Sequence, residues 1–190
     1  MSIESLWRDL EAWLAEHSPE TLAGLQSGAT EAQIEEAEAQ LGVRLPDEVR
    51  ACYRVHNGQD ADAPWLFDGT EFLPLEEIVS QWTVWKELLD CGEFEEFEAS
   101  AEDGVRDQWW NAAWIPFTYN GAGDHLCIDL DPAPGGTPGQ ILEMWHDDDS
   151  RPRVANSFGE FFGRFCRRVA AGDYCVSEEY GGLVLKEDLA

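Results

Sequence analysis

Hydrophobic residues along the first ninety positions recur at the spacing of α-helices. Apolar side chains three and four positions apart predict four helices, over residues 3–16, 30–42, 46–56 and 75–89. Local start signals agree with this pattern: Thr30 and Gln33 have the spacing of a capping box, and Pro46 suits a first helical turn. In the fourth helix, we expect Ile78, Trp85 and Leu88 to face inward.

The pattern changes after residue 113 to short apolar runs separated by turn residues. Three strands are predicted, over residues 114–119, 126–130 and 141–145, with NGAG and PAPGGTPG as the connections. A last helix is predicted over residues 157–171 from the spacing of its phenylalanines. Strands placed between groups of helices indicate an α+β fold, with an antiparallel or mixed sheet flanked by N-terminal helices and a C-terminal helix.

Composition indicates one folded domain over residues 1–190. Hydrophobic residues make up 44% of the chain, and nine Trp with nine Phe supply a core. No run approaches the ~18 apolar residues of a membrane span, and the first residues do not resemble an export signal, so we expect a cytoplasmic protein. The five cysteines include no CxxC pair, which predicts reduced thiols.

Charge narrows the choice of partners. Against 12 basic residues there are 39 acidic ones, which gives a formal charge of -27. Such a surface repels phosphate backbones and anionic lipid, so we expect neither nucleic acid nor membrane as a partner. A basic protein is the natural partner, although acidic surfaces also serve solubility alone.

Several short stretches then occur in a characteristic order. They are LG-x-x-LP, NG, WW, WIPF, NGAGDHLCIDLDP and SFGEFF. In this order they resemble the SMI1/KNR4 family, also called the SUKH superfamily, over about residues 5–172, which leaves 173–190 as a C-terminal extension. The resemblance implies an α+β domain without a catalytic centre. It also implies either a bacterial immunity protein that neutralises a toxin by direct binding, or a regulator or scaffold of cell-wall synthesis as in fungi. The absence of long disordered extensions favours the immunity function.

The stretch TYNGAGDHLCIDLDP places a histidine, a cysteine and aspartates on alternate positions of a predicted strand. His125 and Asp129, with His146 after the next strand, would be the residues of a metal-dependent hydrolase. Residues two apart on a strand lie about 6.5 to 7 Å apart, however, which is a long reach to one ion. We therefore expect a covered or solvated polar face, no bound metal or cofactor, and no enzymatic activity.

Acidic residues with interleaved phenylalanines are the stronger candidate for a contact surface. The segment 93–103 contains six acids and no base, and a second run of acids lies at residues 147–149. Trp65 and Trp110 are further candidates, for lining a groove beside this surface. The alternative is a solvated acidic loop with buried phenylalanines. The predicted partner-binding residues are Glu93, Phe94, Glu95, Glu96, Phe97, Glu98, Glu102, Asp103, Asp147, Asp148, Asp149, Trp65 and Trp110.

Overall fold

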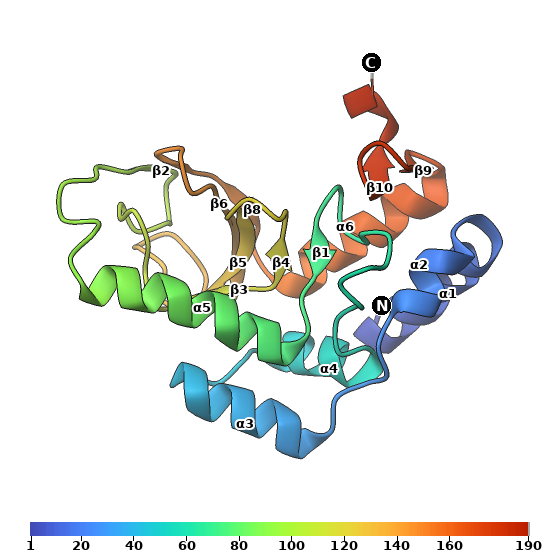
Figure 1. Cartoon of the computed structure of the whole chain (residues 1–190), viewed down its shortest axis with the longest axis horizontal. Coiled ribbons are helices and arrows are strands. Elements are labelled where there is room, and N and C mark those ends of the chain that lie inside the picture. The colour runs from blue at the N-terminus through green and yellow to red at the C-terminus, as the bar shows by residue number, and fades with distance from the viewer. Residues whose placement is uncertain (190) are drawn as a thin grey trace.

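The computed structural model describes residues 1–189, which form six α-helices, ten short strands and a terminal 3-10 turn (Figure 1). The helices are α1 (Ile3–His17), α2 (Pro19–Gly24), α3 (Glu31–Leu41), α4 (Asp47–Val55), α5 (Leu75–Asp90) and α6 (Phe158–Ala171). The strands are β1 (Glu71–Phe72), β2 (Ser100–Ala101), β3 (Trp114–Pro116), β4 (Thr118–Tyr119), β5 (His125–Asp129), β6 (Gln140–Met144), β7 (Ser150–Arg151), β8 (Arg153–Ala155), β9 (Tyr174–Ser177) and β10 (Gly182–Leu185). The predicted α+β fold is confirmed.

Helix ends follow the local signals in the sequence. Thr30 and Gln33 form both hydrogen bonds of the capping box at the start of α3, and Gly42 ends that helix in the left-handed conformation. Ser157 accepts from the backbone N–H of Glu160 at the start of α6. Helix α2 was not predicted, because its six residues are too few to show a helical period.

The central sheet is an antiparallel meander in the order β3-β5-β6-β8. The three predicted strands contain β3, β5 and β6, while β8 was not predicted. The predicted run 114–119 is divided after Phe117, whose N–H still donates to the Leu126 carbonyl at 3.0 Å. The Leu126 N–H donates to the Thr118 hydroxyl at 2.8 Å, and β4 pairs with β1 instead of continuing along β5. Within residues 1–189, one strand pair is parallel: β2 beside β7.

Apolar side chains cover both faces of this sheet. Ile128 and Ile141 face the main core, where Trp7 of α1 packs against Phe162 of α6 with ring centroids 4.9 Å apart. Cys127 and Leu142 face a second cluster, which Trp85 of α5 closes. The prediction that Leu88 points inward was wrong, since 37% of it is exposed on the outer side of α5.

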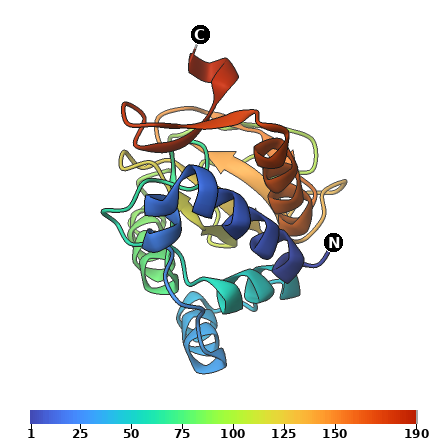
Figure 2. The same cartoon turned by 90° about the vertical axis from the view of Figure 1, so that its right-hand side faces the viewer.

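The C-terminal residues form a hairpin of β9 and β10 that lies across one end of the molecule (Figure 2). The backbone N–H of Leu183 donates to the Trp65 carbonyl at 2.9 Å, and that of Leu185 donates to the Asp68 carboxylate at 3.0 Å. Any side chain at Gly182 would collide with the Trp65 carbonyl oxygen, so only glycine allows this approach. Among the helices of residues 1–189, none is long and apolar enough to cross a membrane.

Candidate acidic binding surface

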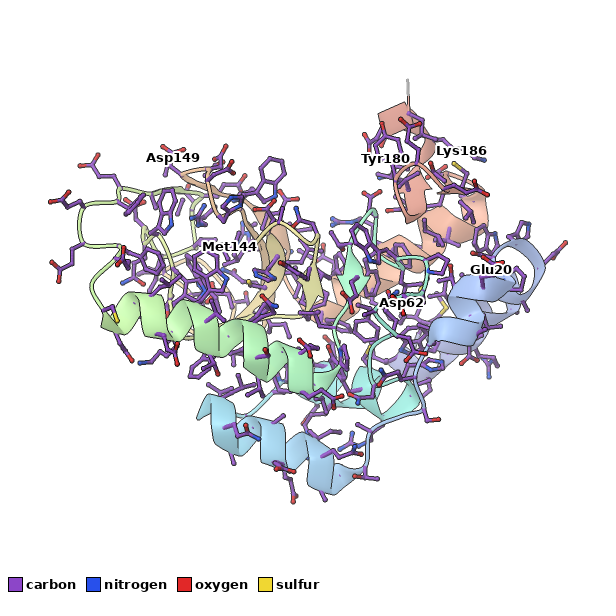
Figure 3. The ribbon with its side chains drawn as sticks, in the orientation of Figure 1. Glu20, Asp62, Met144, Asp149, Tyr180 and Lys186 are labelled. Atoms are coloured by element: carbon purple, nitrogen blue, oxygen red, sulfur yellow. The ribbon has the colours of Figure 1, made fainter. Side chains whose placement is uncertain are left out.

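The two acidic segments predicted from the sequence are neighbours in the structure. Strands β2 and β7 pair, so that the Ser100 N–H donates to the Asp149 carbonyl at 2.8 Å and the Glu102 N–H donates to the Arg151 carbonyl at 3.2 Å. We call residues 93–103 and 147–150 together the acidic surface. Figure 3 shows Asp149 far from Glu20 on α2, at the opposite end of the molecule.

A buried arginine connects the second segment to Trp109, on which Phe97 of the first segment rests. The Arg151 side chain is fully buried, and its Nε and Nη2 donate to the Trp109 carbonyl at 3.1 and 2.8 Å. Its Nη1 donates to the carbonyls of Asp148 and Ser150, both at 2.6 Å. The guanidinium also lies 4.9 Å from the ring centroid of Trp109. Arg151 was not predicted from the sequence. Its one signal is that an arginine directly follows the acidic run Asp147–Asp149 and Ser150.

Most carboxylates of the acidic surface are exposed and point away from the core. Glu102 accepts from the Arg153 N–H at 3.0 Å. Asp148 accepts from the Ser150 hydroxyl and from the Ser150 N–H at 2.7 Å, and these two hydrogen bonds lower the pKa of Asp148. The guanidinium of Arg151 is occupied by carbonyl oxygens and is buried beneath the surface. The arrangement therefore presents a concentrated negative charge to solvent.

The two phenylalanines of this surface have different environments. Phe94 stacks on Trp85 of α5 with centroids 5.7 Å apart, and so ties the segment to the second core cluster. Phe97 is 53% exposed and rests on Trp109, 4.7 Å away. An exposed aromatic side chain among carboxylates is an available anchor for a partner.

The tryptophans predicted to line a groove do not share one. Trp110 is 2% exposed and stacks on Trp85 with centroids 6.3 Å apart, so the prediction that it contacts a partner was wrong. It is buried because α5 and the 105–114 segment enclose it in the second cluster. Trp65 is half-buried beneath the C-terminal hairpin, where its backbone bonds to Gly181 and Leu183.

The residues of the alternative hydrolase site do not assemble into one site. His125 is buried: its Nδ1–H donates to the Thr118 carbonyl at 2.7 Å, and its Nε2 accepts from the Trp85 indole at 3.2 Å. Burial lowers the pKa of His125 to about 4, so the ring is neutral and both nitrogens are engaged. Asp129 accepts from Gln140 at 2.8 Å and from the Asp131 N–H at 3.0 Å, and burial raises the pKa of Asp129. These contacts are those of a satisfied, covered polar face.

His146, the third of those residues, lies beside different acids. Its Nδ1 is 2.9 Å from Asp124 and 3.9 Å from Asp147, and Asp124 also accepts from the His146 backbone N–H at 2.8 Å. The hydrogen bond to Asp124 raises the pKa of His146. Within residues 1–189, Asp124, His146 and Asp147 are the set of potential metal donors that converge, and their mutual ion pairs account for that convergence.

Comparisons with known proteins find a matching family and several similar proteins. A family model described as "SMI1 / KNR4 family (SUKH-1)" matches residues 28–164. "Cell wall assembly regulator SMI1" of Saccharomyces cerevisiae is 25% identical over 209 residues, an alignment that covers 91% of this chain and 41% of that protein. "Cell wall biosynthesis/cell cycle regulator smi1" of Schizosaccharomyces pombe is 27% identical, with 96% and 39% covered.

A similar protein from an animal carries a different name. "F-box only protein 3" of Mus musculus is 42% identical over 185 residues, which cover 92% of this chain and 35% of that protein. The chain thus spans about two fifths of the length of the fungal relatives, at 41% and 39%, and slightly less of the mouse protein.

Proposed function

Because the chain belongs to the SMI1/KNR4 family (SUKH-1), we propose that it is a non-enzymatic protein-binding module of a regulator or scaffold, and that it binds a basic partner through the acidic surface. The fungal relatives are named as regulators of cell-wall assembly and biosynthesis, which supports a role in regulating cell-wall synthesis over a role as a toxin inhibitor. Their names describe no enzymatic activity.

The observation that carries this proposal is the pairing of β2 with β7, which joins two acidic segments, the first of which carries the exposed Phe97. Carboxylates at the rim of an interface raise the rate of association with a basic partner and make it depend on salt. An aromatic anchor at the centre of such an interface slows dissociation instead. The engaged nitrogens of His125 and the paired carboxylate of Asp129 support a function without catalysis.

The immunity function predicted from the sequence is the second candidate, and the charge of -27 is the observation that favours it. A basic toxin domain would fit the same acidic surface, with inhibition by steric masking. A neighbouring reading frame for a large toxin with a variable C-terminal domain would support this second candidate, and its absence would support the regulatory one.

Site-specific crosslinking tests the surface and identifies the partner in one experiment. A photoreactive benzoylphenylalanine at position 97 should trap the partner in cells of the source organism. The matched control places the same group at Glu20 on α2, which is exposed and lies far from Asp149 (Figure 3), and which should give no such adduct. Equal adducts from both positions would indicate non-specific contact.

Binding kinetics with the trapped partner then test the roles of charge and anchor. Replacing Glu95, Glu96 and Glu98 by Gln should slow association and flatten its salt dependence, while Phe97→Ala should speed dissociation. The control replaces Glu16, Glu20 and Glu35, which removes the same formal charge from α1 to α3. Unchanged kinetics for both surface variants at low salt would show that the interface lies elsewhere.

A further inference from the structure

A groove of about 440 Å³ lies between the central sheet, helix α6 and the C-terminal hairpin. Leu126 of β5 and Val154 of β8 form its sheet side, Phe161 and Phe165 its α6 side, and Leu185 of β10 its end. Figures 1 and 2 show the hairpin adjoining the end of α6 that forms this wall. Phe165 and Leu185 lie beyond the residues that match the family model, so part of the groove is built by residues outside that match.

One carboxylate in this groove has no partner. Glu143 lies on β6 opposite Leu126 and is half-buried. Within residues 1–189, its carboxylate receives no hydrogen bond and forms no ion pair, and the charged groups that act on it are the acids Asp68 and Asp124. Burial raises the pKa of Glu143, and these two acids raise it further.

Among residues 1–189, the basic residues near the groove form no ion pair with Glu143. The Arg168 guanidinium binds Asp173 at 3.2 Å and Glu187 at 2.8 Å, both outside the sheet. Arg164 lines the α6 side but makes no ion pair with Glu143, and His125 is held neutral by its burial. Glu143 is therefore a desolvated acid among acids, an arrangement that costs folding stability.

We propose that the groove binds a lysine or arginine side chain of a partner polypeptide, with the Glu143 carboxylate as its ion-pair acceptor. The inference rests on the proposed protein-binding function and adds a second contact site to it. The aliphatic part of a basic side chain would pack on Phe161 and Leu126, and its charged end would reach Glu143. The complementarity is both apolar and electrostatic: a cation from the partner would pair with Glu143, which forms no ion pair within residues 1–189 and lies near Asp68 and Asp124. Asp124 keeps its own ion pair with His146. Arg164 at the α6 side would repel a second adjacent cation, which favours a single basic residue over a basic run.

A titration of the full chain with small probes tests the proposal directly. The probes are N-acetyl-lysine methylamide and, as the charge-reversed comparison, N-acetyl-glutamate methylamide, observed by backbone amide NMR. We expect the lysine probe to shift amides of β5 and β6 around Leu126 and Glu143, and the glutamate probe to leave them unchanged. The isosteric Glu143→Gln should abolish these shifts, whereas Glu98→Gln on the acidic surface should retain them.

Three results would overturn the inference: no shift by the lysine probe up to its solubility limit, equal shifts by both probes, or unchanged binding to Glu143→Gln. Glu143→Asp, which keeps the charge but shortens the side chain, should bind the lysine probe more weakly than the parent and more strongly than Glu143→Gln. If the lysine probe fails while the Glu95, Glu96 and Glu98 variant still slows association with the trapped partner, the groove inference falls and the proposed function stands.

Discussion

The acidic surface and the groove are both acidic, but they hold their charge in opposite ways. On the acidic surface, exposed carboxylates crowd two loops around Phe97, where water and salt screen them. In the groove, the half-buried Glu143 carboxylate lies on a strand, beside Leu126 and the phenylalanines of α6, where screening is weaker. Exposed charge acts over distance on association, whereas desolvated charge acts at contact on specificity. The acidic surface can therefore attract a basic partner, and the groove can select among basic partners at contact.

Replacing one aromatic residue in each region by alanine should lower the free energy of unfolding by very different amounts. Phe165 is 5% exposed and packs against Phe67 with centroids 5.0 Å apart, so Phe165→Ala should destabilise the fold by about 4 kcal/mol. Phe97→Ala should cost less than about 1 kcal/mol, because half of that ring is already in water. Urea unfolding of the two variants measures the difference. Equal losses would mean that Phe97 is structural and not an available anchor.

The free energy of unfolding should decrease at acid pH because of His125, which lines the groove. The unfolded pKa is near 6.5 and the folded pKa is about 4, so between these values the unfolded state binds more protons. Stability from this group is thus complete above pH 6.5 and is lost as the pH falls toward 4, by about 3 kcal/mol. His125→Gln, which does not titrate, should flatten the pH dependence of the unfolding free energy in that window. An unchanged slope would mean that the imidazole is not held neutral.

The acidic surface should depend on the buried Arg151. Arg151→Ala leaves the carbonyls of Trp109, Asp148 and Ser150 without their donor, and should cost about 3 kcal/mol or slightly less. Arg153→Ala is the control, since its half-buried side chain makes one 3.5 Å contact, and it should change stability by less than about 0.5 kcal/mol. Amide exchange should then increase in β2 and β7 but not around the groove. Loss of protection at both sites would show that the two regions are one cooperative unit.

The smallest effect should come from removing charge. Glu143→Gln relieves an unpaired acid whose folded pKa is raised, so it should stabilise the fold by about 0.5 kcal/mol at neutral pH, with the gain fading as the pH falls and Glu143 becomes protonated. The gain should persist at high salt because Glu143 is half-buried. Any gain from replacing Glu95, Glu96 and Glu98 should disappear with added salt. Thermal unfolding at low and high salt compares the two.

Elements with strong local signals were predictable from the sequence. The helix over Glu31–Leu41 follows its capping box, and the strands around His125–Asp129 follow alternation and glycine-rich turns. The division of the run 114–119 was missed because it depends on the Thr118 hydroxyl, which accepts from the Leu126 N–H. The six-residue helix Pro19–Gly24 was missed because fewer than two helical turns leave little periodic signal. The C-terminal hairpin was missed because its position depends on backbone bonds to Trp65, far away in the chain.

The sequence by itself determined the α+β class, the central antiparallel meander and the acidic character of two segments, because periodicity and charge are local properties. Only the tertiary structure decided that β2 and β7 join those segments, that Arg151 lies beneath them, and that Trp110 is buried while Phe97 is exposed. It also decided that Glu143 forms no ion pair within residues 1–189. Pairing and desolvation depend on which distant residues surround a side chain, and a linear pattern does not specify those neighbours.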